Sequence, residues 1–585
     1  MRNVPPKLVR YEDDAEYKKQ PVDPIYIFRG VSPSDSIALP EIPENRKCTD
    51  LVMGGIFLIA VLSLIGSSVY ITSTSDIKIL VNGADKCGNI CGVSNSESDN
   101  NKNCPEKDYT NYPFLDVKAE ECVTADQCKA RNKTLYGALC MPEQRRTPKS
   151  KSKLFAGRDY NKSLENIVPY TIIVLILMPS VASGLSILVY QLLRSHPKCT
   201  FYFFTILSTI FFLLAACYFW YLFATRDHEN VDKNRTLVLL TSAAGFTISG
   251  VLLLCVLVCC SRRIHLLIEV YRETTKAIFH SKLVLLAPIL TMVLVNLVGA
   301  IWLFMMLVTF SVKIPEGETL PGARTGYLIF LIFMGYWIFT FIEGCQCMMV
   351  AGTIASYYFS RDRDNLKGQY CYNVKLVIRF HLGSIATGAL LITIAAMIRI
   401  LIDSLTSYSG SDTWAWEIFR CMLLCIIRCL EEIVNYLTQK AYIMVAIHGK
   451  SFWTSGKRAV KLIWHNFLDT ISVDWLNSAV EFSASALILF VTMLLGYAIL
   501  SAQHMGFIIA NLLFGGALAA SALYVYFSLL STAVGTIFLC YCEDLLINDG
   551  SRERPFFMSK EFQTTVFQAL EFVVEKREER KREDA

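Results

Sequence analysis

Long apolar segments alternate with polar connections along most of this chain. The first of them, residues 51–71, is an uninterrupted apolar run of 21 residues. An α-helix rises about 1.5 Å per residue, so this run is long enough to cross a hydrocarbon core of roughly 30 Å. Further segments of the same character cover residues 167–192, 200–224, 237–260, 283–312, 327–355, 382–402, 418–447, 479–502 and 506–540. The pattern predicts an all-α polytopic membrane protein with about ten transmembrane helices.

Segment 418–447 differs from the others because charged residues interrupt it. Arg428, Glu431 and Glu432 lie inside an otherwise apolar run. A charge at bilayer depth has to face protein or water rather than lipid, which makes it a functional candidate. Two alternatives stay open: Arg428 and Glu432, four residues apart, form an ion pair on one helix face, or the segment lies flat on the cytoplasmic face.

The distribution of Lys and Arg predicts the orientation. Arg46 and Lys47 precede the first span, and connections 194–198, 261–282 and 360–379 carry most of the other basic residues between spans. Cytoplasmic connections are enriched in Lys and Arg, so these parts are predicted to lie inside. Both termini are then cytoplasmic.

This topology divides the chain into five segments. They are a cytoplasmic N-terminal segment (1–49), transmembrane helix 1 (50–72), an extracellular cysteine-rich loop (73–166), a transmembrane bundle (167–540) and a cytoplasmic tail (541–585).

Two sequence patterns inside the bundle predict how its helices pack. In connection 261–282, Ile264, Leu267, Ile268 and Tyr271 recur at helical spacing, which predicts an amphipathic helix lying against the membrane face. Small residues four apart, such as Ser384 with Gly388, let helix backbones approach closely. The same spacing occurs at Gly352 with Ser356, Gly515 with Ala519 and Gly516 with Ala520.

The predicted extracellular loop is rich in cysteine. Its six cysteines are Cys87, Cys91, Cys104, Cys122, Cys128 and Cys140. Outside the cell they predict up to three disulfides in a loop-rich cap, and the sequence does not choose among the pairings. Unpaired thiols are the less favoured alternative, and metal binding is the weaker one because no histidine lies in the loop. Glycosylation sequons begin at Asn132, Asn161 and Asn234, all in segments that the topology places outside.

Composition narrows the classes of function. Of the 585 residues 53% are hydrophobic, so bilayer rather than water is the main solvent. A net charge of +5 gives no argument for a nucleic-acid partner. Gly449-Lys450-Ser451 resembles the end of a phosphate-binding loop, but Met444 stands where that loop requires glycine. With no nucleophile constellation, neither an enzyme, an ATP-driven pump nor a bound cofactor or metal is predicted.

Several separate sequence blocks are similar to one known family. The blocks are GNICG (88–92), AGTIASYYF (351–359), FHLGSIATGALL (380–391), CLEE followed by QKAYIMVAIHGKSF (429–452) and CEDLLINDGSRERPFFMS (542–559). In their order and content they resemble the choline transporter-like family, also called solute carrier family 44. The resemblance runs from the cap to the tail.

The resemblance implies a secondary transporter. It implies ten spans, cytoplasmic termini and sodium-independent movement of choline, for some members ethanolamine, often coupled to protons and supplying phospholipid synthesis. The implied location is the plasma membrane, and the mitochondrial membrane is also compatible with the family. The expected partners are a small amine substrate and the lipid bilayer.

A choline carrier needs a site for a quaternary ammonium. Such a cation has no N–H to donate and is attracted to aromatic faces within about 6 Å. Trp302, Tyr336 and Trp337 are the predicted aromatic contacts, and Glu343 and Glu431 the predicted carboxylates. The alternative for each ring is ordinary packing or a place in the interfacial belt.

Two other functions are compatible with the pattern. A channel or lipid-moving protein would use the same bundle. A receptor or adhesion protein without transport activity would use the disulfide cap instead.

Overall fold

The chain forms two compact units. Unit 1 comprises Met1–Gly55, Glu165–Asn296 and Thr340–Ala585, and unit 2 comprises Ile56–Leu164 and Leu297–Phe339. The computed structural model describes residues 46–75, 82–83, 85, 89–94, 108–131, 133–136, 139–142, 160–225, 233–259, 261–310, 321–361, 363, 368–408, 414–501, 505–548 and 555–564.

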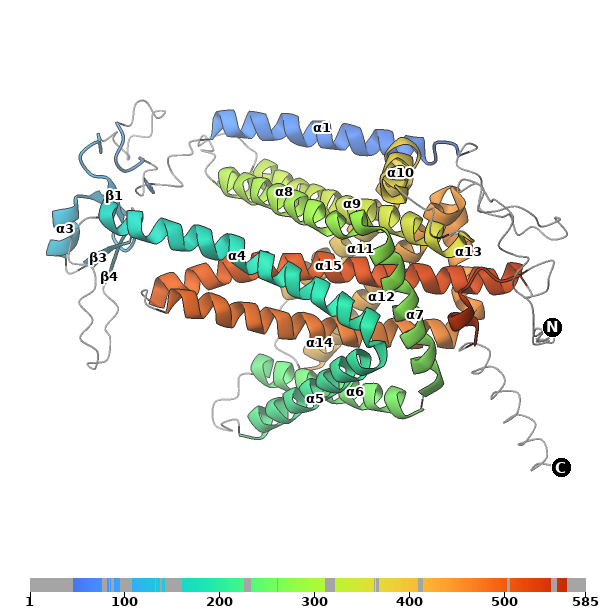
Figure 1. Cartoon of the computed structure of the whole chain (residues 1–585). Helices are drawn as coiled ribbons and strands as arrows, with labels where there is room; N and C mark the ends of the chain where they lie inside the picture. Colours follow the sequence, from blue (N-terminus) through green and yellow to red (C-terminus); the bar gives the residue numbers. More distant parts are fainter. Residues whose placement is uncertain are drawn as a thin grey trace. The chain divides into compact units, whose positions relative to one another are not determined.

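Long helices make up both units outside the cap. They are α1 (Leu51–Thr74), α4 (Tyr160–Ser195), α5 (Pro197–Ala224), α6 (Lys233–Cys259), α7 (Ser261–His280), α8 (Ala287–Phe310), α9 (Pro321–Phe359), α11 (Leu382–Tyr408), α12 (Trp414–His448), α13 (Phe452–His465), α14 (Phe467–Leu500) and α15 (Met505–Ile547). Shorter elements are the 3-10 helix η3 (Lys282–Leu286), α10 (Gln369–Leu376) and the π-helix η4 (Val377–His381). Within unit 1, α5 lies beside α6 and α14 beside α15 (Figure 1).

The described helices confirm an all-α polytopic membrane protein. Nine helices in the described ranges are long and apolar enough to cross a bilayer. A helix satisfies its backbone hydrogen bonds internally, which is why these apolar segments fold as helices in lipid. Helix α12 is not among the nine, because charges interrupt its apolar run, and its crossing stays a prediction. Helices α4 and α15 extend past the predicted limits of their spans, to Tyr160 and Ile547, since helical hydrogen bonding continues beyond the hydrocarbon.

Glycines mark close helix contacts in unit 1. A Cβ at Gly388 of α11 would lie 2.6 Å from the Tyr442 hydroxyl of α12, and one at Gly515 of α15 would lie 2.6 Å from Met178 Sδ of α4. A Cβ at Gly352 of α9 would meet the Asn373 side chain at 2.6 Å. The small-residue spacing in the sequence thus marks positions where other helices pack.

Helix α7 is amphipathic as predicted, but its apolar face does not lie on the membrane. Ile264, Leu267, Ile268 and Tyr271 are at most 1% exposed, and α7 packs against α5, α14 and α15. The prediction of a membrane-facing apolar side is therefore wrong. The sequence period identifies a buried face but does not distinguish protein from lipid as the cover.

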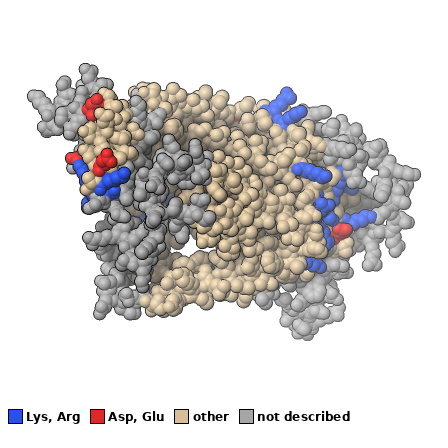
Figure 2. Space-filling view, turned by 60° about the vertical axis from the view of Figure 1, so that its left-hand side comes forward, with Lys and Arg blue, Asp and Glu red and all other residues tan. Residues whose placement is uncertain are grey.

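Residues 46–50, just before α1, are fixed to the rest of unit 1 by polar contacts. Arg46 donates to the carbonyl oxygen of Ala446 at 2.9 Å, at the end of α12. Asp50 accepts from the Phe452 N–H at 2.9 Å and from the Ser384 hydroxyl at 2.6 Å, which supplies a partner to the first N–H of α13. On the face seen in Figure 2, most of the Lys and Arg side chains, drawn in blue, lie at the right-hand edge.

Unit 2 contains a small sheet that the sequence did not predict. Strands β1 (Phe114–Asp116), β2 (Glu121–Val123), β3 (Lys133–Tyr136) and β4 (Leu139–Pro142) form it in the order β2-β1-β4-β3, with helix α3 (Ala125–Ala130) between β2 and β3. Pairs β1/β2 and β3/β4 are antiparallel, and β1/β4 is parallel. These strands are too short to produce a recognisable alternation of apolar and polar residues.

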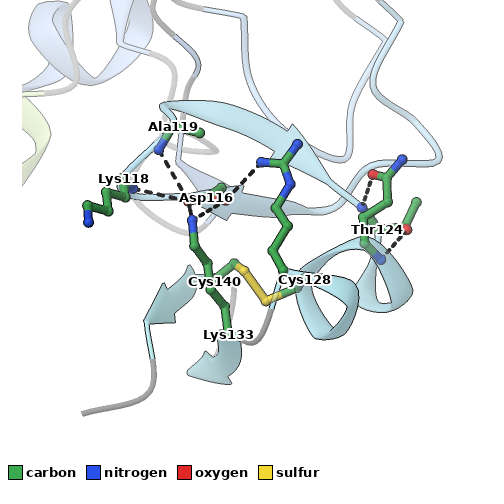
Figure 3. Close-up of a disulfide and its surroundings, with 9 residues drawn as sticks. Asp116, Lys118, Ala119, Thr124, Cys128, Lys133 and Cys140 are labelled. Carbon is green, nitrogen blue, oxygen red and sulfur yellow. Dashed lines mark hydrogen bonds and ion pairs between the residues drawn. A yellow bond between two sulfur atoms is a disulfide. The ribbon is translucent and has the colours of Figure 1, made fainter. Parts of the chain in front are cut away.

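Two disulfides stabilise this cap. Cys91 is bonded to Cys122, and Cys128 to Cys140 (Figure 3). The other two predicted cysteines, Cys87 and Cys104, lie outside the described residues, as does the sequon residue Asn132. The sequons at Asn161 and Asn234 fall in the first turns of α4 and α6, and their glycosylation stays a prediction.

A buried carboxylate organises the charged side of the cap. Asp116 is fully buried and lies 2.6 Å from Lys133 Nζ and 2.9 Å from Arg131 Nη1 (Figure 3). Burial alone would raise its pKa. The hydrogen bonds from Lys133 and Arg131, and those from the N–H groups of Ala119 and Lys118, outweigh burial and lower the pKa of Asp116 to about 2.

Candidate functional site

The predicted aromatic contacts lie in unit 2, where two of them make clear packing contacts. The Trp302 indole N–H donates to the Leu331 carbonyl at 2.8 Å, joining α8 to α9. Its ring lies where a Cβ on Gly335 would clash. Trp337 is 3% exposed and meets the rings of Phe57 and Phe333 edge-on. Tyr336 is the most open of the three, at 36% exposed.

The predicted carboxylates lie in unit 1, on different helices and with different neighbours. Glu431 of α12 is paired with Arg399 of α11, with 2.5 Å between Oε2 and Nε. Glu343 of α9 faces the hydroxyl of Tyr524 in α15. Glu431 thus already has a cationic partner, whereas Glu343 is hydrogen-bonded to a phenol.

One sequence alternative for α12 is wrong. Arg428 and Glu432 are both exposed, and among the described ion pairs none joins them. A pairing four residues apart in sequence is allowed by helix geometry, but here the neighbouring carboxylate, Glu431, turns toward α11 instead.

A second pair of carboxylates lies on α14, at Asp474 and Glu481. They are seven residues apart, so they face the same side of the helix. The part of α14 that is long and apolar enough to cross a membrane is Thr470–Leu500. Glu481 therefore lies about 16 Å along this stretch of 31 residues, roughly a third of its length, and Asp474 lies about 6 Å along it.

Asp474 is held between an ammonium and a phenol of α12. Lys440 Nζ lies 2.9 Å from Asp474 Oδ1, and the Tyr436 hydroxyl donates to Oδ2 at 2.7 Å. The same ammonium lies 5.0 Å from the centre of the Tyr436 ring. The Lys440 side chain is 8% exposed and that of Asp474 is 27% exposed. This arrangement binds a cation with one carboxylate and one aromatic ring.

Glu481 is held by neutral groups. Asn477 Nδ2 donates to Glu481 Oε1 at 2.8 Å, and the Ser531 hydroxyl of α15 also bonds to this carboxylate. The Asn477 side-chain oxygen accepts from the Tyr271 hydroxyl of α7 at 2.7 Å. The charge of Lys440 acts on Glu481 from a greater distance. A carboxylate without a direct cationic partner at this depth is suited to bind a proton or a cation.

We call these residues of α7, α12, α14 and α15 the inner polar network. Its members are Tyr271, Tyr436, Lys440, Asp474, Asn477, Glu481 and Ser531. None of them is among the predicted contact residues. Glu481 had a usable signal, because it is a carboxylate inside the apolar segment 479–502. Lys440 had the same kind of signal, as a charge inside segment 418–447, but its pairing with Asp474 had none, because it joins two helices across 34 positions of sequence.

The sequence of this chain is similar to those of known proteins. A family model described as plasma-membrane choline transporter matches residues 244–546, more than half of the chain. The matched range includes every member of the inner polar network and also Glu343 and Glu431.

Curated relatives extend the similarity. Choline transporter-like protein 1 of Xenopus laevis is 27% identical over 398 residues, which cover 64% of this chain and 61% of that protein. Choline transporter-like protein 2 of Dictyostelium discoideum is 26% identical over 591 residues, covering 88% of this chain and 94% of its own. Choline transporter-like protein 1 of Torpedo marmorata is 25% identical over 613 residues, covering 88% and 92%. The chain spans about three fifths of the Xenopus relative and nearly all of the other two, and it belongs to the choline transporter-like family.

Proposed function

We propose that this protein is a secondary transporter that moves choline, or a close amine such as ethanolamine, across the plasma membrane. The observation that carries the proposal is the Tyr436–Asp474 arrangement, in which a carboxylate and an aromatic ring already surround an ammonium. The family membership and the names of the relatives support the same substrate class.

The proposed transport needs no sodium and is coupled to protons. Glu481 supports proton coupling, since a carboxylate inside the membrane-spanning stretch of α14 with neutral hydrogen-bond donors can alternate between charged and protonated forms. Glu343 beside Tyr524 is a second proposed carboxylate on the same grounds. Trp302, Tyr336, Trp337 and Glu431 are kept as further proposed contacts for the substrate.

Uptake of labelled choline by the purified protein in liposomes tests the proposal. The expected result is saturable uptake that unlabelled choline competes away, that does not change when sodium is replaced, and that responds to an imposed proton gradient. Asp474→Asn is expected to abolish saturable uptake, whereas Glu481→Gln is expected to reduce the response to the gradient.

Asp403→Asn is the matched control. It removes a carboxylate that also accepts from a basic residue of α12, Arg420, but is 52% exposed and lies outside the inner polar network, so uptake should be unchanged. Uptake equal to that of empty liposomes by folded, correctly oriented protein would overturn the proposal. Lipid movement or non-saturating flux would favour the channel-like alternative.

A further inference from the structure

The position of the Lys440 ammonium is unusual for a membrane protein interior. It is almost completely buried and is held by a carboxylate and by the face of a ring on its own helix. Attraction of a cation to a ring face within about 6 Å is also how proteins recognise quaternary ammonium ligands. Lys440 therefore occupies a place whose chemistry suits the amine substrate.

The surroundings of Lys440 leave room for this ammonium on the side of α15. Gly535 is the neighbour there, and a Cβ at that position would lie 3.1 Å from Lys440 Nζ. A side chain larger than hydrogen at Gly535 would press on the ammonium. The absence of a side chain at Gly535 thus lets α15 border the cation site without filling it.

Titratable groups of two neighbouring helices, α14 and α9, act on Lys440. From α14 both Asp474 and Glu481 act on it, and from α9 the thiol of Cys347 lies within range of its charge. Asp474 and Glu481 are two turns apart on one face, about 10 Å along the helix axis. Lys440 is paired with Asp474 and its charge also acts on Glu481, so a turn of its side chain along this face would move the ammonium from one carboxylate toward the other.

We propose that Lys440 is a tethered cation that competes with the ammonium group of the transported amine for Asp474 and Tyr436, and that it turns toward Glu481 when the amine binds. This inference rests on the proposed function. Two ammonium groups cannot share the one partly buried carboxylate of Asp474 without repulsion, so entry of one ammonium requires the other to leave. Lys440 would then set how tightly the site holds its substrate.

Choline-dependent thermal stability of the purified protein tests the competition. The wild type, Lys440→Met and Lys440→Met/Asp474→Asn are heated with increasing choline or tetramethylammonium, with NaCl at equal ionic strength as the reference. Lys440→Met removes the competitor, so its apparent Kd for choline should fall; if Lys440 fills the site about nine-tenths of the time, the fall is about tenfold. In the double variant the gain should disappear, because the carboxylate of Asp474, for which the two cations compete, is gone.

Lys461→Met is the matched control, since Lys461 is an exposed lysine of α13 outside the network. Its apparent Kd should equal that of the wild type. The competition is overturned if Lys440→Met binds choline no more tightly than the wild type, or if the double variant binds as tightly as Lys440→Met. A purely structural ion pair would lower the stability of Lys440→Met without any specific rescue by choline.

Two further variants guard against misfolding and test the role of Glu481. Gly535→Ala keeps every charge but crowds Lys440 Nζ, so it should also tighten choline binding. It takes the place of Lys440→Met as the test if that variant does not fold. Glu481→Gln should weaken choline binding when Lys440 is present and have little effect in the Lys440→Met background. Equal weakening in both backgrounds would overturn the turning of Lys440 toward Glu481.

The outcomes separate this inference from the function on which it rests. Saturable choline uptake by the wild type with no gain in Lys440→Met would overturn the competition alone. Neither uptake nor choline binding by the wild type and by Lys440→Met would overturn both.

Discussion

At the scale of single residues, three carboxylates of unit 1 are distinguished by their partners. Asp474 faces an ammonium, and Glu481 faces neutral donors. Asp544, at the end of α15, accepts from the Tyr358 hydroxyl at 3.1 Å, from Asn548 at 2.7 Å and from the backbone N–H groups of Phe557 and Met558. The first two suit substrate or proton binding, whereas Asp544 fixes the segment after α15 to the bundle.

Replacing Asp544 tests that structural role. Asp544→Ala leaves the Tyr358 hydroxyl and two backbone N–H groups buried without a partner, and each such group costs about 1–3 kcal/mol. We expect the midpoint of thermal unfolding to fall and the chain to become sensitive to protease after residue 548. Asp403→Asn, at an exposed ion pair, should change the free energy of unfolding by less than about 1 kcal/mol. A stable, protease-resistant Asp544→Ala protein would contradict this role.

Asp116 predicts an acid sensitivity that is confined to the cap. Its pKa in the folded cap is about 2, below the ordinary 3.8. A depressed pKa stabilises the folded state above the ordinary value, and this stabilisation is lost as the pH falls through the folded value. The protection factors of the cap amides, which take account of the pH dependence of intrinsic exchange, should therefore be unaffected by this group down to about pH 4 and fall between about pH 4 and 2.

Asp116→Asn supplies the comparison. It lacks the titrating group, so the protection factors of its cap amides should be lower at neutral pH. They should then lose most of the further decrease that the wild type shows in acid. Asp126→Asn, at an exposed carboxylate of α3, is the control and should follow the wild type. An unchanged acid response in Asp116→Asn would assign the effect to another residue.

At the scale of elements, glycine positions decide which helix pairs form. Gly388→Val would drive a branched side chain into Tyr442 and Thr438 of α12. Overpacking of this kind costs about 1–3 kcal/mol, so the unfolding midpoint should fall. Gly245 of α6 has nothing within 4 Å of an added Cβ, and Gly245→Ala should be neutral or stabilise by up to about 1 kcal/mol. Equal effects of the two substitutions on thermal unfolding would refute the packing interpretation.

The sequence predicted where the helices lie along the chain better than it predicted which helices contact one another. Apolar run length located the helices because a bilayer requires about 20 apolar residues per span. Small-residue spacing marked Gly388 as a contact, but its contact with Tyr442 depends on how α11 and α12 align. The cap strands of three or four residues were missed, because so short a run has no periodicity to detect. The apolar face of α7 was found but assigned to lipid instead of protein.

At the candidate site, too, single residues could be predicted from the sequence but their partners on other helices could not. Glu431 and Glu343 were predicted because a carboxylate in an apolar run is visible in sequence. Whether it meets Arg399, as Glu431 does, or a tyrosine hydroxyl, as Glu343 does, depends on a second helix. The ring beside the site, Tyr436, could not be chosen among the aromatic residues before Asp474 was placed next to it.

At the scale of the whole molecule, the main question of topology is whether α12 crosses the membrane. It has 35 residues, about 50 Å of helix, which is more than a bilayer requires. It runs along α11 from the Arg420–Asp403 pair to the hydrogen bond between the Tyr442 hydroxyl and the Ile385 carbonyl. On α11 these two contacts are 18 residues apart, about 27 Å, which is close to the roughly 30 Å of a hydrocarbon core. We therefore expect a helix that follows α11 over this distance to cross with it.

The charges of α12 agree with crossing because neighbouring helices satisfy several of them. Arg420 and Glu431 pair with α11, and Lys440 pairs with α14. A charged residue in a span is tolerated when it faces such partners instead of lipid. We therefore predict that the connection before α12 and the connection after it lie on opposite sides of the membrane.

Glycosylation mapping in cells checks this prediction. In a chain with Asn132, Asn161 and Asn234 replaced by Gln, a sequon inserted within residues 409–413 should gain a glycan, because that connection is predicted to face outside. The same insertion between Gly449 and Ser451 should stay unmodified. Restoring Asn132 alone is the positive control for access to the modifying enzyme. If the inserted sequon at 409–413 stays bare while the Asn132 control is modified, α12 lies on the cytoplasmic face, and the number of spans and the sidedness of the cation site have to be revised together.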